Sequence, residues 1–147
     1  METRCGVVLV EEHGLEKGLA LFLDALSRGC HGLCITRKPV SFTEPCPRQS
    51  LRLSHMIGGN NLRPDRLKIL GRTVLDLFAE KENIAVFLEG IDYLALENDL
   101  SAVLRLLHLL ADSAIEANAL LIVSIDPELF QEREMVLLRR ALDSSAP

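Results

Sequence analysis

The amino-acid sequence predicts an α/β fold, a three-layer sandwich in which helices cover both faces of a mostly parallel, five-stranded sheet. Short apolar runs alternate along the chain with longer segments in which apolar residues recur every three or four positions, a pattern typical of strands alternating with amphipathic helices. The run Ile84–Leu88 is apolar throughout, as expected for a strand buried on both faces of a parallel sheet. A chain of 147 residues is long enough for one domain with a substantial core. We therefore expect a single domain, residues 1–147, with Ile84–Leu88 as its central strand and residues 144–147 frayed.

The beginning of the chain has the pattern of one strand–helix–strand unit. Strands are expected at Gly6–Val10 and Gly32–Thr36, and a helix from about Leu15 to Ser27, whose apolar residues fall on one face. Gly29 suits the end of this helix. The short connections favour a right-handed βαβ unit.

The next segment begins with a loop rich in proline, Val40–Ser50. Leu51–Ile57 alternates weakly between apolar and polar residues, which predicts a third strand at an edge of the sheet. Pro64 suits the first position of a helix that we expect to continue to about Lys81.

The second half of the chain repeats the pattern after the central strand. A long helix is expected at Asp99–Glu116 and a fifth strand at Ala119–Ile125. Asp126 and Pro127 then favour the start of a final helix that ends near Asp143, because aspartate caps helices and proline fits their first turn.

Composition and charge limit the kinds of partner and the cellular location that we expect for this protein. The net charge is −5 and the sequence shows no basic face, which argues against a nucleic-acid partner. The longest apolar runs are too short to span a bilayer, so we expect no membrane association. The first strand begins within a few residues of the start, which leaves no room for a signal peptide, and the four cysteines are expected to be reduced thiols. These features together predict a cytoplasmic protein.

Three segments resemble one known family: Gly32–Pro39, Val86–Asn98 and Leu121–Pro127. Their order and spacing are similar to those of domain of unknown function 835, found mainly in archaea and some bacteria, and the resemblance covers nearly the whole chain. It implies a protein with no established activity, from a family often fused to, or encoded with, sensor and signalling domains. The chain departs from the family at His55, where a tryptophan is expected, which bears on local packing and not on the fold.

The resemblance also implies a fold related to the RecA-type ATPases, including the circadian-clock ATPases, with the phosphate-binding loop lost. The strands would then lie in the spatial order third, second, fourth, fifth, first. A phosphate-binding loop needs Gly-x-x-x-x-Gly-Lys-Ser/Thr after the first strand, whereas residues 11–18 contain three glutamates and a lysine that precedes its glycine. The sequence also lacks a Gly-x-Ser-x-Gly elbow. We therefore predict no catalytic residues and no enzymatic activity.

The implied arrangement gathers acidic residues at one edge of the sheet: Glu11, Glu12, Glu89, Asp92 and Asp126. Such a rim suits a divalent cation or a basic partner surface. The alternative is that these residues are solvated loop acids and helix caps.

A cationic cluster is expected near the end of the second strand, where Arg37, Lys38 and Arg48 bracket the proline-rich loop. With Thr36 they could hold a phosphate or a carboxylate. The alternative is that the arginines pair with nearby glutamates.

The cysteines offer a further candidate site. Cys30, His31, Cys34 and Cys46 crowd around the second strand and could form a zinc site or a redox pair. Their spacing matches no recognised metal site, and buried cysteines commonly act as small apolar residues. We predict no metal site and no cofactor.

Leu106 and Leu109 lie outside the main apolar stripe of their helix. They indicate either a partner surface or a helix buried on two faces. From these features we predict a non-enzymatic regulatory or protein-interaction module of a cytoplasmic signalling system. Its partner would be a protein, such as a sensor or signalling protein, or a second copy in a homodimer. The alternative is a sensor that binds a nucleotide or a divalent metal through the loops at the carboxyl ends of the strands.

Overall fold

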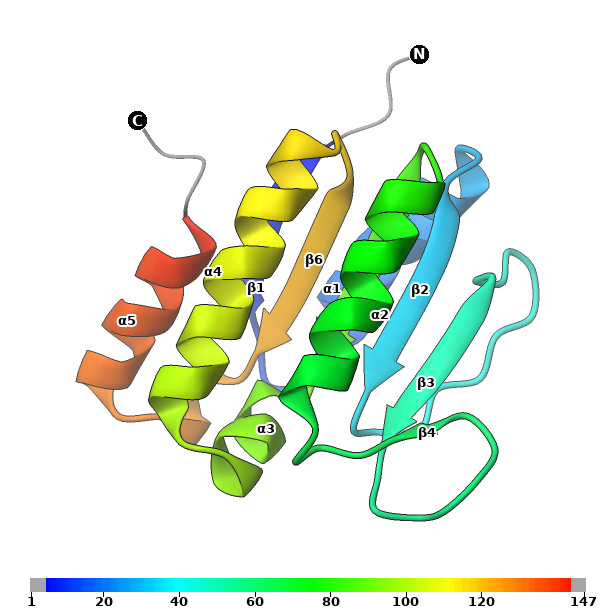
Figure 1. Cartoon of the computed structure of the whole chain (residues 1–147). Helices are drawn as coiled ribbons and strands as arrows, with labels where there is room; N and C mark the ends of the chain where they lie inside the picture. The colour runs from blue at the N-terminus through cyan, green and yellow to red at the C-terminus, as the bar shows by residue number, and fades with distance from the viewer. Residues whose placement is uncertain (1–4, 144–147) are drawn as a thin grey trace.

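A computed structural model describes residues 5–143, which form a parallel β-sheet with helices on both faces (Figure 1). Its strands are β1 (Gly6–Glu11), β2 (His31–Thr36), β3 (Gln49–Leu53), β4 (Asn61–Leu62), β5 (Ile84–Glu89) and β6 (Leu120–Ile125). Its helices are α1 (Glu16–Ser27), α2 (Leu67–Glu80), α3 (Ile91–Glu97), α4 (Leu100–Glu116) and α5 (Glu132–Leu142), with a 3₁₀ turn η1 (Pro127–Leu129). Within the described part of the chain, no helix combines the length and apolar character needed to cross a bilayer. The predicted fraying of residues 144–147 lies outside the described residues.

The order of the strands in the sheet is β1-β6-β5-β2-β3-β4, and all the pairs are parallel. The five longer strands follow the order that the family resemblance implied. The expected count of five strands is wrong for residues 5–143, because β4 adds a sixth beside β3, where Leu62 pairs with Leu53. The predicted central strand is confirmed, since β5 lies between β6 and β2 and all six of its residues are buried.

The two faces of the sheet are covered unequally. The larger core lies between the sheet and helices α2, α3, α4 and α5, whereas the smaller core is covered by α1 (Figure 1). In the smaller core Phe22 of α1 stacks on Phe87 of β5, with ring centroids 5.9 Å apart. Phe42, from the loop after β2, meets Phe22 edge-on at 6.3 Å. The expected three layers are therefore present, with one helix forming the layer on this face.

The largest differences from the sequence predictions concern the third strand and three of the helices. The third strand ends at Leu53 and not at Ile57, and α2 begins at Leu67 because a turn follows Pro64. The chain enters α3 directly after β5, and this short helix was not predicted. Asp126 caps η1, whereas α5 begins only at Glu132, because Phe130 is extended and interrupts the helical conformation.

Candidate functional site

Glu89 ends the central strand and connects it to the chain that leaves β2. Its side chain is 7% exposed, and Oε1 accepts the backbone N–H groups of Arg37 at 3.0 Å and Lys38 at 3.2 Å. The hydroxyl of Thr36 donates to the carbonyl of Lys38 at 2.7 Å. Burial raises the pKa of Glu89, although the two amides act in the opposite direction. Thr36, Arg37 and Glu89, each singled out from the sequence, are thus joined in one hydrogen-bonded cluster.

Arg37 links three elements at the carboxyl edge of the sheet. Its guanidinium lies over the ring of Tyr93 in α3, 4.3 Å from the centroid, a cation–π contact. Its Nη1 donates to the carbonyl of Leu53 at 3.5 Å. His55 meets the same Tyr93 ring edge-on and pairs with Glu97. His55, found where the resemblance led us to expect tryptophan, therefore packs at this junction.

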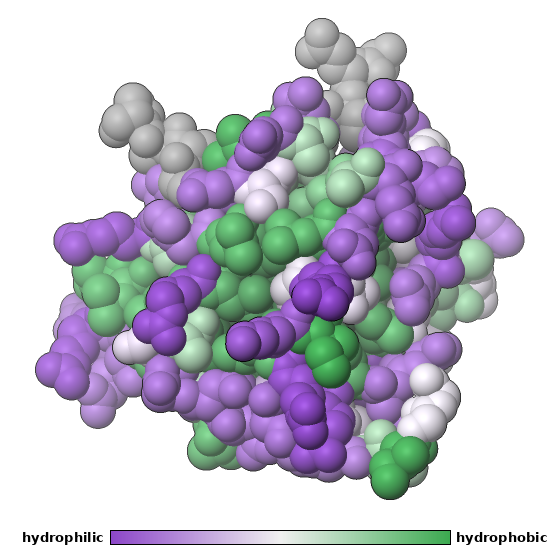
Figure 2. Space-filling view, in the orientation of Figure 1, coloured by the Kyte–Doolittle hydropathy of each residue, from purple (hydrophilic) through white to green (hydrophobic). Residues whose placement is uncertain are grey.

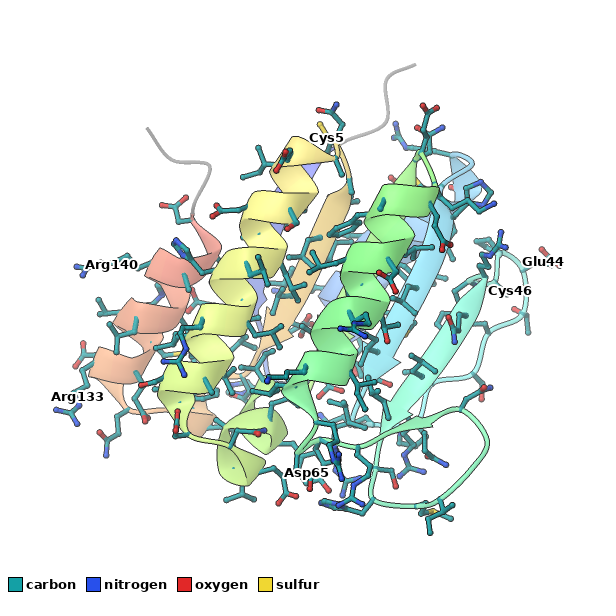
Figure 3. The ribbon with its side chains drawn as sticks, viewed as in Figure 1. Cys5, Glu44, Cys46, Asp65, Arg133 and Arg140 are labelled. Carbon is teal, nitrogen blue, oxygen red and sulfur yellow. The ribbon has the colours of Figure 1, made fainter. Side chains whose placement is uncertain are left out.

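Arg48 does not join the predicted cationic cluster. β3 runs parallel to β2 and begins at Gln49, which pairs with Leu33, so Arg48 lies at the amino edge of the sheet. Cys46, two residues earlier, marks that end of β3 (Figure 3). Arg52 takes the expected place, since its Nε donates to the carbonyl of Arg37 at 3.4 Å. The prediction failed because the loop must return along the whole strand before a parallel pair can form.

Glu12 holds the amino end of α1. One of its carboxylate oxygens accepts the N–H of Lys17 at 2.8 Å, and the other accepts the N–H of Gly18 and the hydroxyl of Ser124, both at 2.9 Å. These backbone groups are the unpaired amides of a helix start, which attract anions. Glu12 thus supplies an internal carboxylate at the place where a phosphate-binding loop would hold its ligand.

The remaining rim acids are engaged separately. Arg139 forms two hydrogen bonds to Glu11, at 2.9 and 2.7 Å, and this contact lowers the pKa of Glu11. Asp126 accepts the N–H of Glu128 at 3.0 Å and lies 3.2 Å from Nδ1 of His13. Asp92 is exposed in the first turn of α3. The interpretation of these acids as solvated loop acids and helix caps thus fits Asp92 and Asp126, whereas the ion pair of Glu11 with Arg139 was not part of it.

One cluster at this edge has metal-binding side chains close together. Ligand atoms of His13, Asp126 and Glu128 all lie within 4.8 Å of one another. Within residues 5–143, this is the one group in which three histidine, cysteine or acidic side chains come close enough to share a metal ion. A cavity of about 410 Å³ adjoins it, between the β1–α1 connection and Pro127. His13 was not among the residues singled out from the sequence, because it stands 113 positions from Asp126.

The cysteines near β2 are divided between the core and the surface. Cys30 and Cys34 are buried, whereas Cys46 is exposed in the loop before β3 (Figure 3). Burial raises the pKa of Cys34 to about 12 and also raises the pKa of Cys30. A high pKa disfavours the thiolate, which is the form that binds zinc or attacks a disulfide. The geometry therefore agrees with the interpretation of these two cysteines as small apolar residues.

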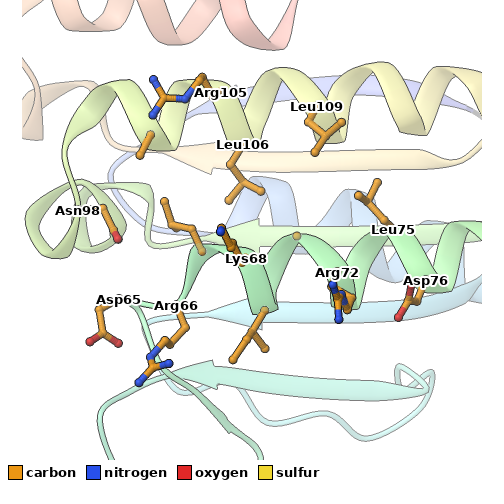
Figure 4. Close-up of a pocket in the computed structure, with 14 residues that line it drawn as sticks. Asp65, Arg66, Lys68, Arg72, Leu75, Asp76, Asn98, Arg105, Leu106 and Leu109 are labelled. Carbon is orange, nitrogen blue, oxygen red and sulfur yellow. The ribbon is translucent and has the colours of Figure 1, made fainter.

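An apolar groove runs between α2 and α4. Leu106 and Leu109 of α4 point toward α2, and Leu75 of α2 points back toward α4 (Figure 4). Leu106 forms the floor and is 8% exposed, whereas Leu109 is 49% exposed. The groove has a volume of about 830 Å³, and Figure 2 shows an apolar strip there, bordered by hydrophilic side chains. Leu106 is thus buried, as expected for a helix buried on two faces, whereas Leu109 is half-exposed, as expected for a partner surface.

A second groove, of about 490 Å³, lies on the other side of α4, against α5. It shares Arg105 and Leu109 with the first groove. Ile69 of α2 and Leu137 of α5 extend the apolar surface and are 50% and 42% exposed. Both lie off the buried stripe of their own helix, and that was the signal in the sequence that could have identified them.

The α2–α4 groove also brings cations together. Arg66, Lys68 and Arg72 line it from α2 and the residue before it, and Arg105 lines it from α4 (Figure 4). These residues are too scattered in the sequence to appear as a basic segment, so no basic face was predicted.

Comparison with known proteins gives a family and no activity. A family model described as protein of unknown function (DUF835) matches residues 12–142. No curated protein matches the chain.

Proposed function

The chain belongs to the DUF835 family, whose description assigns no activity, and from its own surfaces we propose a non-enzymatic protein-interaction module of a cytoplasmic signalling system. The proposed docking surface is the helical face formed by α2, α4 and α5. We also propose that the fold is a degenerate relative of the RecA-type ATPases, which the order of the five longer strands supports.

The observation that carries the proposal is the exposure of Leu109 between two apolar grooves. Leu109 lies in the middle of α4, is 49% exposed and lines both grooves. Ile69 and Leu137 make the apolar surface wider on either side. Large contiguous apolar patches on soluble proteins usually mark binding surfaces.

Two features of the carboxyl edge support a role without catalysis. Glu12 occupies the amides at the start of α1, where it would repel a phosphate. Glu89 is buried and hydrogen-bonded to the backbone after β2.

Site-specific photo-crosslinking in cells tests the proposal. A photo-reactive amino acid at Ile69 lies in the groove, and one at Asp24, exposed on α1, lies on the opposite side of the sheet. We expect Ile69 to give an adduct with one discrete protein that is lost when Leu109→Glu is added, and Asp24 to give none. Equal adducts from both positions, or an adduct that Leu109→Glu leaves unchanged, would contradict the proposal.

A second candidate function is sensing of a divalent cation, favoured by the approach of His13, Asp126 and Glu128. A thermal-shift series with Mg²⁺, Zn²⁺ and ATP on reduced protein tests it. A ligand at about one hundred times its Kd adds about 2.7 kcal/mol to the free energy of unfolding. Sensing predicts a metal-dependent shift that His13→Ala and Glu128→Gln abolish, and a shift that survives both substitutions would exclude this cluster.

A further inference from the structure

We propose that the α2–α4 groove binds an amphipathic helix of a partner protein, with acidic side chains flanking its apolar stripe. This inference rests on the proposed interaction function and adds the chemistry of the partner to it. Three features carry it: the shape of the groove, its depth at Gly71 and the sign of the charge along its walls.

The shape of the groove matches two turns of a helix. Apolar residues line it from Leu67 to Leu75 on α2 and from Ala102 to Leu109 on α4. At 1.5 Å per residue these spans are about 12 Å and about 10 Å. That length suits three apolar side chains spaced i, i+3 or i+4, and i+7, the pattern by which helices are held in grooves.

Gly71 gives the groove its depth. It lies on the buried side of α2, and a Cβ added there would lie 3.1 Å from Cδ1 of Leu106. Because Gly71 has no side chain, the floor of the groove is low at this position. The side chains of Leu75 on α2 and Leu109 on α4 stand higher on its two sides. A bulky side chain of the partner helix fits above this position, where the ridge of α2 is missing.

The walls of the groove favour an acidic partner. The charged residues that line it are Asp65, Arg66, Lys68, Arg72, Asp76 and Arg105. Asp65 is engaged by Arg63 through two hydrogen bonds, at 3.0 and 2.9 Å, which leaves Asp76 as the acid facing four cations. The charge of this groove is therefore opposite in sign to the net charge of −5 of the whole chain. Acidic side chains on a partner helix would be attracted here, while a basic helix would be repelled.

A pair of designed peptides tests the inference by fluorescence anisotropy. Both are stapled helices of about 15 residues with the same three leucines at i, i+4 and i+7. One carries glutamates beside the leucines and the other carries lysines at the same positions. We expect the acidic peptide to bind with a Kd at least about tenfold lower than the basic peptide, and added salt to reduce the difference.

Three variants locate the binding. Leu109→Glu and Arg72→Glu should each weaken binding of the acidic peptide by about tenfold or more. Arg48→Glu makes the same change of charge at the amino edge of β3, lines neither groove and should leave binding unchanged. Circular dichroism checks that each variant is folded.

The outcomes separate this inference from the function on which it rests. Equal affinity for the two peptides, or binding that Arg72→Glu leaves intact, overturns the acidic-helix inference. If neither peptide binds but the photo-reactive residue at position 69 still gives its adduct, the acidic-helix inference fails and the interaction function stands. If neither peptide binds and no adduct forms, both proposals fail. Sedimentation of the protein alone is the remaining test, because a dimer that Leu109→Glu dissociates would assign the groove to a second copy and overturn the inference.

Discussion

Glu89 is a carboxyl group held away from water at the end of the central strand. Two backbone amides donate to Oε1, while burial raises the pKa of the group. The ionised form is therefore less stable in the folded protein than in the unfolded chain. Its contribution to the free energy of unfolding is fully present below the ordinary pKa of glutamate and is lost as the pH rises through the raised native pKa.

Glu89→Gln tests this pH dependence. Glutamine keeps a carbonyl oxygen for the two amides but cannot ionise. The free energy of unfolding of the variant, minus that of the wild type, should therefore increase as the pH rises above the ordinary pKa of glutamate and through the raised native pKa. Urea denaturation at a series of pH values measures the difference, and Glu80→Gln, at an exposed residue of α2, controls for the change in net charge. A difference that stays constant or falls with pH would contradict the burial argument.

Gly90, between Glu89 and α3, combines a positive φ with a close approach of the backbone to Arg37. Its φ is +100°, and an added Cβ would lie 2.9 Å from Cβ of Arg37 and 3.1 Å from Cδ1 of Leu53. Gly29 has nearly the same φ, +101°, with nothing within 4 Å. Gly29→Ala should thus cost about 1 kcal/mol of stability from the backbone, and Gly90→Ala about 1–3 kcal/mol more from overpacking. Equal losses in chemical denaturation would show that the close contacts are relieved without cost.

At the scale of single residues, the sequence predicted which side chains belong to the candidate site better than it predicted the contacts that they make. Thr36, Arg37 and Glu89 do come together, because each lies at or just after the carboxyl end of a parallel strand, and these ends meet at the same edge of the sheet. The role of Glu12 was not predictable, since its partner Ser124 is 112 positions away. Arg48 was misplaced because nothing in a loop sequence states how far the loop travels.

At the scale of elements, α4 supports both the core and the proposed docking surface. Asp99 caps it, with a carboxylate oxygen 2.8 Å from the N–H of Ala102. Leu107 and Leu110 are fully buried on its inner side, whereas Leu109 and Arg105 face outward into the grooves. The position of the groove therefore depends on how α4 is anchored to the sheet.

Removing the cap of α4 should lower stability by a predictable amount. Asp99→Ala leaves the N–H of Ala102 without its side-chain acceptor and should cost about 1 kcal/mol. Asp112→Ala, at an exposed position in the same helix, should change the free energy of unfolding by less than about 0.5 kcal/mol. Thermal and urea denaturation of the two variants provide the comparison. Equal effects would mean that the loss of a negative charge, and not the cap, is responsible.

The elements that the sequence missed are the shortest ones. α3 has seven residues and follows β5 with only Gly90 between them, so no loop signal or capping residue marks its start. β4 has two residues, too few for any periodic pattern. The long helices were predicted because an apolar stripe over several turns is a strong signal.

At the scale of the whole molecule, the sheet separates two cores. Ile35 of β2 belongs to the larger core and Ile122 of β6 to the smaller one, and both are fully buried. β5 lies between their two strands, whose backbones are therefore about 9.5 Å apart, and the two side chains point to opposite faces of the sheet.

Loss of one methylene group in each core should therefore be additive. Ile35→Val and Ile122→Val should each cost about 0.5–1.5 kcal/mol, and the double variant should equal their sum to within about 0.5 kcal/mol. Urea denaturation of the four proteins gives the coupling energy. A coupling energy well above that limit would show that strain passes through β5 from one core to the other.

The overall architecture followed from the sequence in two steps of different kinds. The α/β class followed from periodicity, because apolar runs such as Ile84–Leu88 and helical stripes differ clearly. The order of the strands came only from the family resemblance, since hydrophobic patterns carry no information on which strands are neighbours. The meeting of α2 and α4 cations in one groove depends on that order, and periodicity alone could not give it.

The position of β1 at the edge of the sheet also has a consequence for folding during synthesis. β1 pairs with β6, and Gly6 and its partner Leu120 are 114 positions apart in the sequence. At a rate of synthesis of about 5–20 residues per second, β6 is made about 5–20 s after β1. Until β6 arrives, the apolar residues Val7–Val10 have no strand to pair with, and a nascent chain stopped before Leu120 exposes an unpaired edge that is prone to aggregate. β1 is thus translated well before the strand that pairs with it.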